Sequence, residues 1–562
     1  MQVIINEKPY DFEMGETILD VARKNKIEIP TLCYLKNIIG DSNCRICMVE
    51  NTFNQRLMPA CSTRCYDGLS VITNSPRVVK SRKDTLKLIL SNHHKNCDEC
   101  AKQGACTLEK LFKKYKITEQ NKPEFEKQNF QIDSSSPCII RNNNKCILCG
   151  RCVSVCKNTQ AVDAITKQKR GFSMFVGCAF NKPLECSTCV GCGQCTLVCP
   201  TGALLENSEI EAVEKHIADS NKFVVAQVAP SVRVSLAEYF NNPIGTFDEG
   251  RMVTALKMLG FDKVFDVNMG ADFTVVEESE ELLERIKQNK NLPLFSSCCP
   301  AWFKYVNTFY PNHTGHLSTC KSPTEMLGAL IKNYYAKKEH IDPKNIIVVG
   351  IMPCTAKKGE KFRGHDVDQV LTTREVAKLI EKHSIDYNHL EKSEFDKPLS
   401  SYSGSGLIFG ATGGVTEAVL RCVSRKLENS DDRVDFVDVR HGEGRKEVKV
   451  KCGKTELKLC VVSGLKNAKA VMDDIVSGAK KYDFVEVMAC PGGCVNGGGQ
   501  NYVDYSHIDV EDVKKLRANS IYNKDKEMGS RLSDQNADLK QIYADFFIPS
   551  PKLAKQILHY KH

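Results

Sequence analysis

The sequence predicts a multidomain protein in which small α+β units precede a larger α/β domain with parallel sheets. The chain has 562 residues, too many for a single hydrophobic core, and this length is typical of roughly three to five domains. Many of its 28 cysteines lie in closely spaced groups before residue 200. From about residue 210 onward, apolar runs alternate with helical stretches, which is typical of parallel strands buried on both faces.

The composition favours metal ligation over disulfides. Secreted disulfide scaffolds are mostly short, whereas the cysteines of this long chain fall in CxxC runs. The N-terminus, MQVIINEKPYDF, enters a strand pattern without a leader, and no apolar run is long enough for a membrane span. We therefore expect a cytoplasmic protein with no membrane association. The net charge of +9 suits either an acidic partner or a surface of solvated lysines, and no motif indicates nucleic acid.

The first predicted domain covers residues 1–78. It begins with a strand at Val3–Ile5, a turn and a second strand, followed by a helix at Glu16–Lys24 and short strands near 56–59 and 69–73. Its cysteines, in the spacing C-x10-C-x2-C-x13-C, are Cys33, Cys44, Cys47 and Cys61. The spacing resembles the plant-type loop around a 2Fe-2S cluster, although its first interval is longer than usual. Structural zinc is the alternative, but zinc prefers two CxxC pairs and this group has one.

The second predicted domain covers residues 79–125. Ser75 and Pro76 form a typical helix start, an N-cap residue followed by proline, and apolar residues then recur at helical spacing toward His93. The candidate ligands His93, Cys97, Cys100 and Cys106 form H-x3-C-x2-C-x5-C, which could close around a 4Fe-4S cluster with one imidazole ligand. His94 is adjacent and equally available.

The third predicted domain covers residues 126–209, after a polar stretch at 113–137 that we expect to cross the surface. It contains two near repeats of the two-cluster ferredoxin spacing, in which the fourth cysteine of each run ligates the other cluster. We therefore assign one 4Fe-4S cluster to Cys146, Cys149, Cys152 and Cys199. The second is assigned to Cys189, Cys192, Cys195 and Cys156.

The fourth predicted domain covers residues 210–562. Its expected strands are FVVAQVAP, KVFDV, PLFSSCC, IIVVGIMPC, LIFGATGG, KLCVVSG and FVEVMAC. Three motifs follow such runs: SSCCPAW at 296–302, MPCTAKKGE at 352–360 and EVMACPGGCVNGGGQ at 486–500. In open α/β sheets, functional residues gather at the carboxyl ends of strands. Four cysteines could therefore converge on one metal cluster: Cys299, Cys354, Cys490 and Cys494.

These three motifs resemble the signature motifs of the iron-only (FeFe) hydrogenases. The N-terminal order of a plant-ferredoxin-like domain, a Cys3His domain and a two-cluster ferredoxin-like domain resembles the larger, clostridial-type monomeric members. The resemblance covers essentially the whole chain. It implies that the four cysteines hold a 4Fe-4S cube, bridged by Cys494 to a two-iron subcluster with carbon monoxide, cyanide and a dithiolate amine. It also places these residues around the two-iron unit: Ala229, Pro230, Ser231, Met352, Pro353, Lys357 and Met488.

Hydrogen chemistry needs protons as well as electrons. Cys298, next to Cys299, is a thiol that could exchange protons with the bridging amine. Glu278, Glu281 and Arg285 are spaced to share one helix face, which by itself indicates a solvated surface. The resemblance instead implies a proton path that runs through Cys298, Glu278, Ser318 and Glu281 and leaves at Arg285.

The chain departs from the family pattern at a few positions. Ser297 and Ala301 vary the common TSCCPGW form, and Thr324 and Glu325 stand where many relatives have two glutamines. The second departure bears on hydrogen bonding to a carbon monoxide ligand. Some cysteines have no assigned role, and we expect most of them to be inert buried thiols. They are Cys65, Cys138, Cys178, Cys186, Cys320, Cys422, Cys452 and Cys460.

The resemblance implies reversible reduction of two protons to hydrogen. The electrons would come from reduced ferredoxin or flavodoxin along the iron-sulfur clusters, and maturation proteins would supply the two-iron unit of the monomeric enzyme. The alternative function is a non-catalytic, hydrogenase-like protein of iron-sulfur assembly or hydrogen sensing. A respiratory electron-transfer subunit would share the N-terminal cluster order but lack the SSCCPAW and GGGQ motifs. An NADH-linked complex would need a partner subunit, because this chain has no nucleotide-binding fingerprint.

Overall fold

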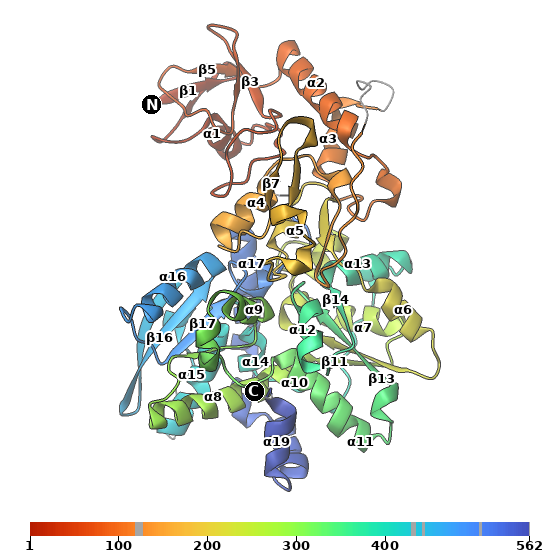
Figure 1. Cartoon of the computed structure of the whole chain (residues 1–562), viewed down its shortest axis with the longest axis vertical. Coiled ribbons are helices and arrows are strands. Elements are labelled where there is room, and N and C mark those ends of the chain that lie inside the picture. Colours follow the sequence, from red (N-terminus) through yellow and green to blue (C-terminus); the bar gives the residue numbers. More distant parts are fainter. Residues whose placement is uncertain (119–126, 429–433, 441–443, 505–507, 561–562) are drawn as a thin grey trace.

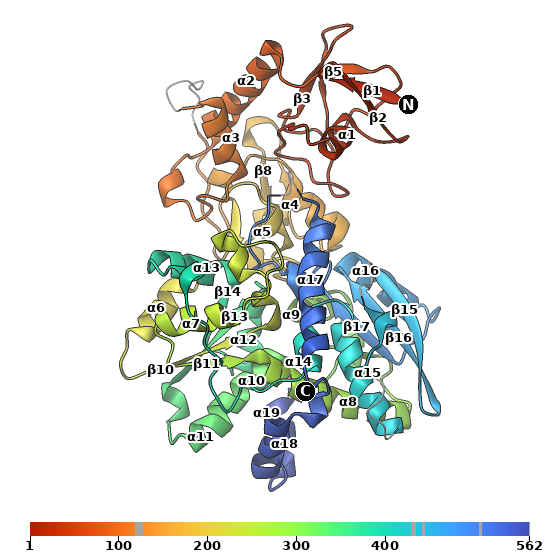
Figure 2. The ribbon, with the colours of Figure 1, turned by 180° about the vertical axis from the view of Figure 1, so that it is seen from behind.

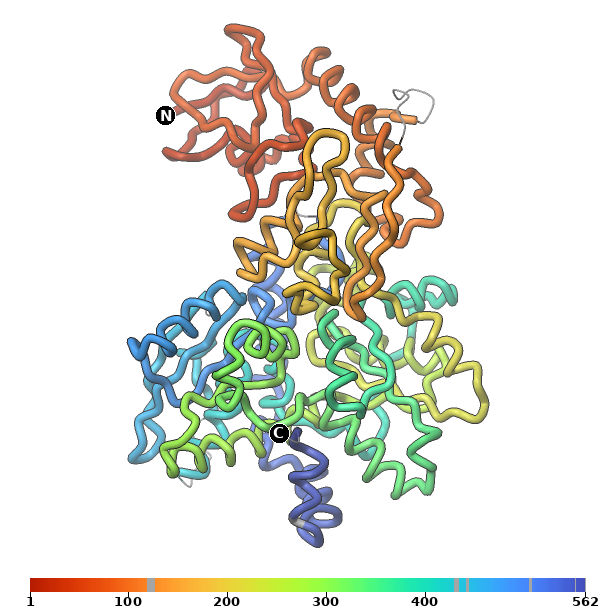
Figure 3. Tube along the Cα trace, in the orientation of Figure 1, coloured from red at the N-terminus to blue at the C-terminus, as the bar shows by residue number. Residues whose placement is uncertain are grey.

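The computed structural model describes residues 1–118, 127–428, 434–440, 444–504 and 508–560. Figure 1 shows three levels: the N-terminal elements at one end, a small unit around α4 and α5 in the middle, and two larger sheets at the other end. The two ends of the chain lie far apart, and the C-terminal end lies among the helices around the two larger sheets (Figure 3). None of the described helices has the length and apolar character needed to cross a membrane.

The N-terminal sheet has the strand order β2-β1-β5-β3-β4. Its strands are β1 (Gln2–Ile5), β2 (Lys8–Asp11), β3 (Met48–Asn51), β4 (Leu57–Pro59) and β5 (Ser70–Ile72). The sequence predicted all of them except β3. Helix α1 (Ile18–Lys24) begins two residues later than predicted because Thr17 is its N-cap and forms a capping box with Asp20.

Helix α2 (Pro76–Asn92) begins where the sequence predicted. Ser75 caps it by accepting a hydrogen bond from the backbone N–H of Val78 at 3.2 Å, and the helix ends at His93. Helix α3 (Thr107–Tyr115) extends into the stretch that was predicted to cross the surface. Its side chains Phe112 and Tyr115 are buried, so the start of that stretch packs against the protein. Residues 119–126 of that stretch lie outside the described part of the chain.

The middle unit consists of short elements that present cysteines. Strands β6 (Ile139–Arg141) and β9 (Leu204–Glu206) pair antiparallel, and so do β7 (Thr166–Gln168) and β8 (Phe175–Gly177). Helices α4 (Arg151–Ser154) and α5 (Gln194–Val198) each begin after a glycine with positive φ, Gly150 at 84° and Gly193 at 68°.

The largest part contains two four-stranded sheets. The first has the order β11-β10-β13-β14 and is entirely parallel. Its strands are β10 (Phe223–Val228), β11 (Lys263–Asp266), β13 (Ile346–Met352) and β14 (Gln369–Thr372). The second has the order β12-β17-β16-β15. Its strands are β12 (Leu294–Phe295), β15 (Arg445–Cys452), β16 (Thr455–Ser463) and β17 (Phe484–Met488).

The prediction of parallel sheets is confirmed except at one edge. Strand β15 runs antiparallel to β16, because the turn between them is too short for a crossover. The predicted strand LIFGATGG is wrong: Gly404–Ile408 forms helix α14. Ser403 caps that helix, and Gly406 lets it approach α8 so closely that an added Cβ would lie 2.5 Å from the carbonyl oxygen of Asn268.

Helix α8 (Val267–Gln288) is central to this part, in contact with α10 (Pro323–Leu330), α14 and α15 (Gly414–Glu428). Helix α17 (Val510–Glu527) runs along the rear from the middle unit toward α14 (Figure 2), and α19 (Pro551–Leu558) returns to α10. The other helices are α6 (Ile210–Ile217), α7 (Gly250–Met258), α9 (Pro300–Phe309), α11 (Ala336–Lys338), α12 (Lys357–Gly364), α13 (Thr373–Lys382), α16 (Leu465–Val476) and α18 (Ala537–Ile542).

Candidate functional site

The four predicted active-site cysteines lie beyond the carboxyl ends of strands from both large sheets. Cys299 follows β12 and is the N-cap residue of α9. Cys354 follows β13, and Cys490 follows β17. Cys494 begins a short turn of 3-10 helix. The two sheets therefore supply one site between them, as expected for open α/β sheets.

The four thiols lie close to one another, with Cys490 buried and the other three half-buried. Burial raises the pKa of Cys354, and the charge of Cys299 raises it further, to about 12. Burial is also the largest cause of the raised pKa of Cys494, followed by the charges of Cys354 and Cys299. The same neighbours act on Cys490. All of the cysteines lie in the described part of the chain, and none of them forms a disulfide there. Buried thiols in such a group can all ionise when a metal cluster carries their charge, so this donor set fits an iron-sulfur cluster.

The glycines of the GGGQ motif allow three backbone segments to meet at the site. An added Cβ on Gly497 would lie 2.2 Å from the carbonyl oxygen of Pro353, and one on Gly498 would lie 2.3 Å from that of Cys192. Gln500 then donates a hydrogen bond to the carbonyl oxygen of Ser231 at 2.9 Å. The motif thus joins the active-site loops to the middle unit.

The residues expected around the two-iron unit lie at the ends of neighbouring strands. Ala229, Pro230 and Ser231 follow β10, and Met352 and Met488 end β13 and β17. All of them are buried. They therefore lie next to the strand ends from which the site cysteines follow, and their place around a two-iron unit stays a prediction.

Lys357, the first residue of α12, is a buried cation beside Cys298. Its Nζ donates to Glu360 Oε2 at 2.6 Å, to Ser322 Oγ at 2.8 Å and to the Cys298 carbonyl oxygen at 3.4 Å. Burial opposes its charge, but the Glu360 carboxylate raises the pKa of Lys357 overall. A fixed ammonium group fits anionic ligands on a metal cluster. The sequence analysis missed Glu360 and Ser322, although Glu360 stands three residues after Lys357 on one helix face.

Glu278 lies inside the protein rather than on a solvated helix face. Its side chain is 1% exposed, and its Oε2 has no hydrogen-bond partner among the described residues. Burial, reinforced by Glu281, raises the pKa of Glu278 to about 8. Burial and the charge of Glu278 also raise the pKa of the Cys298 thiol well above its usual value. A carboxyl group with this pKa can gain and lose a proton near neutral pH.

Glu281 continues the line of polar groups toward the surface. Ser318 Oγ donates to Glu281 Oε2 at 2.9 Å, and Arg285 Nη2 donates to Glu281 Oε1 at 2.5 Å. Arg285 also donates to the carbonyl oxygens of Asn291, Gly315, His316 and Leu317. The structure therefore brings together all of the residues of the predicted proton path.

The cysteines of the middle unit line two separate cavities. One cavity is lined by Cys146, Cys149, Cys152 and Cys199. The other is lined by Cys156, Cys189, Cys192 and Cys195. The fourth cysteine of each run thus faces the cavity of the other run, which is the crosswise grouping that the spacing predicted. The remaining lining of the second cavity is mostly apolar.

His93 lies in a buried position suited to a metal ligand. The residue is 7% exposed, its Nδ1 has no hydrogen-bond partner among the described residues, and burial lowers the pKa of His93 to about 4. The neighbouring His94 already bonds through Nε2 to the carbonyl oxygen of Gln128 at 2.9 Å. An unpaired neutral imidazole nitrogen can bind a metal, so the buried ring of His93 fits the ligand role that the spacing predicted. Cys97 and Cys106 are both electrostatic neighbours of Cys100.

The N-terminal cysteines also form a compact group. The Sγ atoms of Cys47 and Cys61 are 3.3 Å apart, and the backbone N–H of Cys44 donates to Cys33 Sγ at 3.4 Å. Arg151 joins this group to the middle unit through a hydrogen bond to the Tyr34 carbonyl oxygen at 2.9 Å.

Close contacts also join the other cysteine groups. The backbone N–H of Thr107, directly after Cys106, donates to the carbonyl oxygen of Pro200 at 3.1 Å. Thr355 Oγ1, next to Cys354, donates to the carbonyl oxygen of Gly191 at 2.7 Å. Arg374, which the sequence analysis missed, donates to the carbonyl oxygens of Gly498 and Gln500 and pairs with Glu206 of β9. No residue spacing in the sequence indicated that role.

Thr324 and Glu325 take different positions. Thr324 Oγ1 donates to the Met352 sulfur at 3.6 Å, so this residue faces the site. Glu325 Oε2 accepts a hydrogen bond from the backbone N–H of Asp366 at 3.3 Å. Burial and the neighbouring carboxylates of Glu360 and Asp366 raise the pKa of Glu325 to about 8. Of these two residues, Thr324 is therefore the one that donates a hydrogen bond to a residue of the expected cofactor pocket.

Comparison with family models finds five matching regions. They are a 2Fe-2S iron-sulfur cluster binding domain at 1–76, an NADH-ubiquinone oxidoreductase-G iron-sulfur binding region at 82–121 and a 4Fe-4S dicluster domain at 145–203. The C-terminal domain of the iron-only hydrogenase large subunit matches 222–498, and the iron hydrogenase small subunit matches 511–562.

Similar proteins span the whole chain. The NADP-reducing hydrogenase subunit HndD of Solidesulfovibrio fructosivorans is 40% identical, with 100% of this chain and 98% of that protein covered. Iron hydrogenase 1 of Clostridium pasteurianum is 39% identical, with 100% and 99% covered. The cytosolic iron-sulfur assembly component 3 of Mus musculus is 30% identical over 57% of this chain and 71% of that protein.

Solved structures agree with these relationships. The apo FeFe-hydrogenase of Chlamydomonas reinhardtii matches with a TM-score of 0.56 and 32% identity, covering 63% of this chain and 98% of that structure. The enzyme relatives cover the accessory cluster regions as well as the site, and the site's three cysteine motifs lie together in the structure. The chain therefore belongs to the iron-only hydrogenase family.

Proposed function

We propose that the protein catalyses the reversible reduction of two protons to hydrogen at a cluster held by Cys299, Cys354, Cys490 and Cys494. The observation that carries the proposal is the meeting of two different routes at this site. One is a series of cysteine groups, the last of which reaches the site where Thr355, next to Cys354, bonds to Gly191. The other is a line of polar side chains that begins at Cys298. When bound, the 4Fe-4S cube and two-iron subcluster would supply electron storage and an open metal position for hydrogen.

Proton transfer to the site depends on side chains that can gain and lose a proton without changing their positions. In the direction of hydrogen formation, the Cys298 thiol gives up its proton at the site and recovers one from Glu278. Glu278, with a pKa of about 8, is protonated at neutral pH and can supply it. Ser318 passes a proton from Glu281 by rotation of its hydroxyl group. Arg285 holds the Glu281 carboxylate in position, since a guanidinium keeps its own protons.

The electron side would use four accessory clusters. Cys33, Cys44, Cys47 and Cys61 would bind a 2Fe-2S cluster, and His93, Cys97, Cys100 and Cys106 a 4Fe-4S cluster. The two middle cavities would hold 4Fe-4S clusters on their crosswise sets of cysteines. Cys494 would bridge the cube to the two-iron subcluster, beside Lys357 as the donor to its anionic ligands.

The proposed organisation follows these groups of ligands. It consists of a 2Fe-2S domain at 1–78, a His/Cys3 domain at 79–125, a two-cluster domain at 126–209 and a catalytic domain at 210–562. A reducing compartment such as the cytoplasm would keep the ligand thiols free, and dedicated maturation proteins would supply the two-iron unit. We propose an acidic ferredoxin or flavodoxin as the electron partner of a monomeric enzyme, consistent with the net charge of +9.

The similarity to a protein named as an iron-sulfur assembly component raises a non-catalytic alternative. The polar line from Cys298 to Arg285 argues against it, because an assembly or sensing protein has no need for rapid proton supply. The name of the Solidesulfovibrio relative raises a second question, whether partner subunits link this chain to a nicotinamide cofactor. Purification from native cells followed by size-exclusion chromatography would separate a monomer from such a complex.

Infrared spectroscopy of the matured protein tests the catalytic proposal. We expect bands of iron-bound carbon monoxide and cyanide, together with hydrogen evolution from a reduced dye. The Cys494→Ala variant should lose both the bands and the activity, because it lacks the proposed bridging thiolate. The Cys422→Ser variant changes a buried thiol outside the three site motifs and should retain them. A matured wild-type protein with the bands but no hydrogen evolution would contradict catalysis and favour the assembly or sensing alternative.

A further inference from the structure

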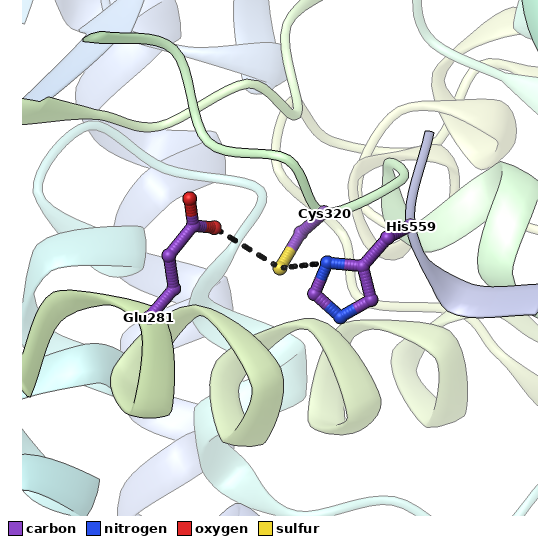
Figure 4. Close-up of side chains that lie close together, drawn as sticks. All are labelled: Glu281, Cys320 and His559. Atoms are coloured by element: carbon purple, nitrogen blue, oxygen red, sulfur yellow. Dashed lines mark hydrogen bonds between the residues drawn. The ribbon is translucent and has the colours of Figure 1, made fainter. Parts of the chain in front are cut away.

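Glu281, Cys320 and His559 form a cluster of which the proposed reaction uses only Glu281. One donor atom from each of the three side chains lies within 4.8 Å of those of the other two. Cys320 Sγ is 3.8 Å from Glu281 Oε2 and 3.9 Å from His559 Nδ1. Figure 4 shows all three side chains directed toward one point between α8 and the C-terminal segment. The sequence analysis had treated Cys320 as an inert buried thiol.

Backbone pairing fixes two members of this cluster opposite each other. Cys320 and His559 form an antiparallel bridge. On either side of it, the Lys321 N–H donates to the Leu558 carbonyl oxygen at 2.8 Å, and the Tyr560 N–H donates to the Thr319 carbonyl oxygen at 2.9 Å. Helix α8 supplies Glu281 from the third side. The donor atoms are therefore held by structure that does not depend on a ligand.

His559 has the orientation of a metal-binding histidine. Its Nε2 lies 2.9 Å from Glu277 Oε2, and Glu277 also accepts a hydrogen bond from the Tyr543 hydroxyl group. Because a carboxylate can only accept, Nε2 carries the ring proton and Nδ1 presents its lone pair to the cluster. Metal-ligating histidines commonly donate their other ring N–H to a carboxylate in this way.

We propose that Glu281, Cys320 and His559 form a binding site for a divalent cation with the chemistry of Zn²⁺. Thiolate, imidazole and carboxylate are the ligands that zinc prefers, and water would complete a tetrahedral set. The Thr319 hydroxyl group, now 2.8 Å from His559 Nδ1, would rotate away. The Cys320 thiol would release its proton to solvent as the metal binds.

Charge and access are both compatible with a bound cation. The two positive charges of the metal and the one of Arg285 would face the Cys320 thiolate and the carboxylates of Glu281 and Glu277, so the group as a whole would be neutral. The side chains of His559 and Glu277 are 14% and 16% exposed, and that of Glu281 is 11% exposed. Solvent therefore reaches the edge of the site while its centre is enclosed.

Occupancy would also block the proton path, a consequence that rests on the proposed function. Glu281 Oε2 is the atom to which Ser318 donates, at 2.9 Å. A metal ion on that oxygen would remove its ability to pass a proton to Ser318. Zinc would then inhibit hydrogen turnover without touching any iron-sulfur cluster.

The first test measures binding alone. The cluster-loaded enzyme is titrated with zinc, dialysed and assayed for bound metal, and X-ray absorption at the zinc edge identifies its ligands. We expect a tight site with one sulfur ligand that is lost in Cys320→Ser and His559→Gln. In Glu277→Gln the affinity should fall by about ten- to hundredfold. Cys422→Ser and His389→Gln are controls, a buried thiol and an exposed imidazole that are not among the three proposed ligands, and should bind zinc as the wild type does.

The second test measures hydrogen evolution from a reduced dye with and without zinc, as a ratio within each variant. The wild type should lose most of its rate, and Cys320→Ser and His559→Gln should be insensitive. Zinc binding without sulfur, or binding and inhibition unchanged in both variants, would overturn the site. Binding at these three residues without inhibition would support the site and instead refute the place of Glu281 in the proton path. Unchanged spectra of the reduced clusters would show that zinc displaced no iron.

Discussion

The region around the middle cavities and the region around α8 lead to the same site but differ in the polarity of their side chains. Besides cysteines, the two cavities are lined mostly by apolar side chains, among them valines, isoleucines and leucines. The line along α8 consists of buried polar groups in contact, Glu278, Ser318, Glu281 and Arg285. Electrons can cross apolar packing between clusters, whereas protons need adjacent groups that donate and accept. The difference therefore identifies which particle each region would carry.

Removing the titratable group nearest to Cys298 should have the largest effect. In Glu278→Gln the amide cannot take up or release a proton, and we expect turnover to fall by about 10²- to 10⁴-fold while the clusters still assemble. Cys298→Ser should act in the same way. Hydrogen evolution from a reduced dye measures the rate, and iron content with infrared bands measures assembly.

Glu280→Gln is the matched control for this prediction. It makes the same chemical change on the same helix, but the Glu280 side chain is 63% exposed and pairs with Lys426 at the surface. We expect a nearly unchanged rate. If Glu278→Gln retained most of its activity, the polar line along α8 would not be the proton path.

The dependence on pH should be the next largest effect. Proton delivery needs protonated Glu278, whose pKa is raised to about 8 mainly by burial. Hydrogen evolution should therefore fall about tenfold between about pH 7 and about pH 9, whereas hydrogen uptake, which needs the carboxylate, should rise. A pH profile of both directions with dye mediators measures this. The low residual rate of Glu278→Gln should lack that transition, and an identical transition in the variant would assign it to another group.

The same shift predicts a change in stability. Because the pKa of Glu278 is higher in the folded protein than the usual value of about 4.3, the folded state holds its proton more tightly. This group therefore lowers stability as the pH rises from about 4.3 through about 8. Thermal unfolding of Glu278→Gln should show a gain relative to wild type at about pH 9 and little change at about pH 4.

The cysteine groups and the active site differ in how far the sequence could predict them. Cys146 to Cys199 lie on short local segments, so spacing alone predicted which of them share a cavity. The active-site cysteines come from strands that are distant along the chain. Their places after apolar runs indicated that they could converge, and the family resemblance was needed to say which cluster they would hold. The strand at LIFGATGG was predicted wrongly because its apolar run is short, and the cap at Ser403 decided in favour of a helix.

Residues that act through tertiary contacts gave no usable signal. The hydrogen bonds of Arg374 to the GGGQ loop depend on packing between the middle unit and α13. The approach of His559 to Cys320 depends on where the C-terminal segment returns. The same holds for Glu278 and Glu281 of α8. Their spacing correctly placed them on one helix face, but by itself it indicated that this face is solvated. Burial, which decides their chemistry, is a property of the fold.

Replacing one cysteine that lines the cavity of the other run should have a smaller, selective effect. Cys199→Ser should impair the cluster of Cys146, Cys149 and Cys152, although Cys199 lies in the other run of the sequence. Electron paramagnetic resonance of the reduced protein measures which cluster changes. The rate with a protein carrier should fall several-fold more than the rate with a small dye, which can reach clusters nearer the site. Cys186→Ser, at an exposed thiol that lines neither cavity, is the control.

The smallest effect on turnover should come from His93→Cys. A thiolate adds negative charge where the imidazole is neutral, so the potential of that cluster should fall while the cluster itself is retained. His94→Cys is the matched control, because the ring of His94 is already bonded to the carbonyl oxygen of Gln128. Redox titration followed by paramagnetic resonance should show the shift in the first variant alone. A shift of the potential in His94→Cys instead would identify His94 as the ligand. The contrast between the apolar electron route and the polar proton route would be unaffected.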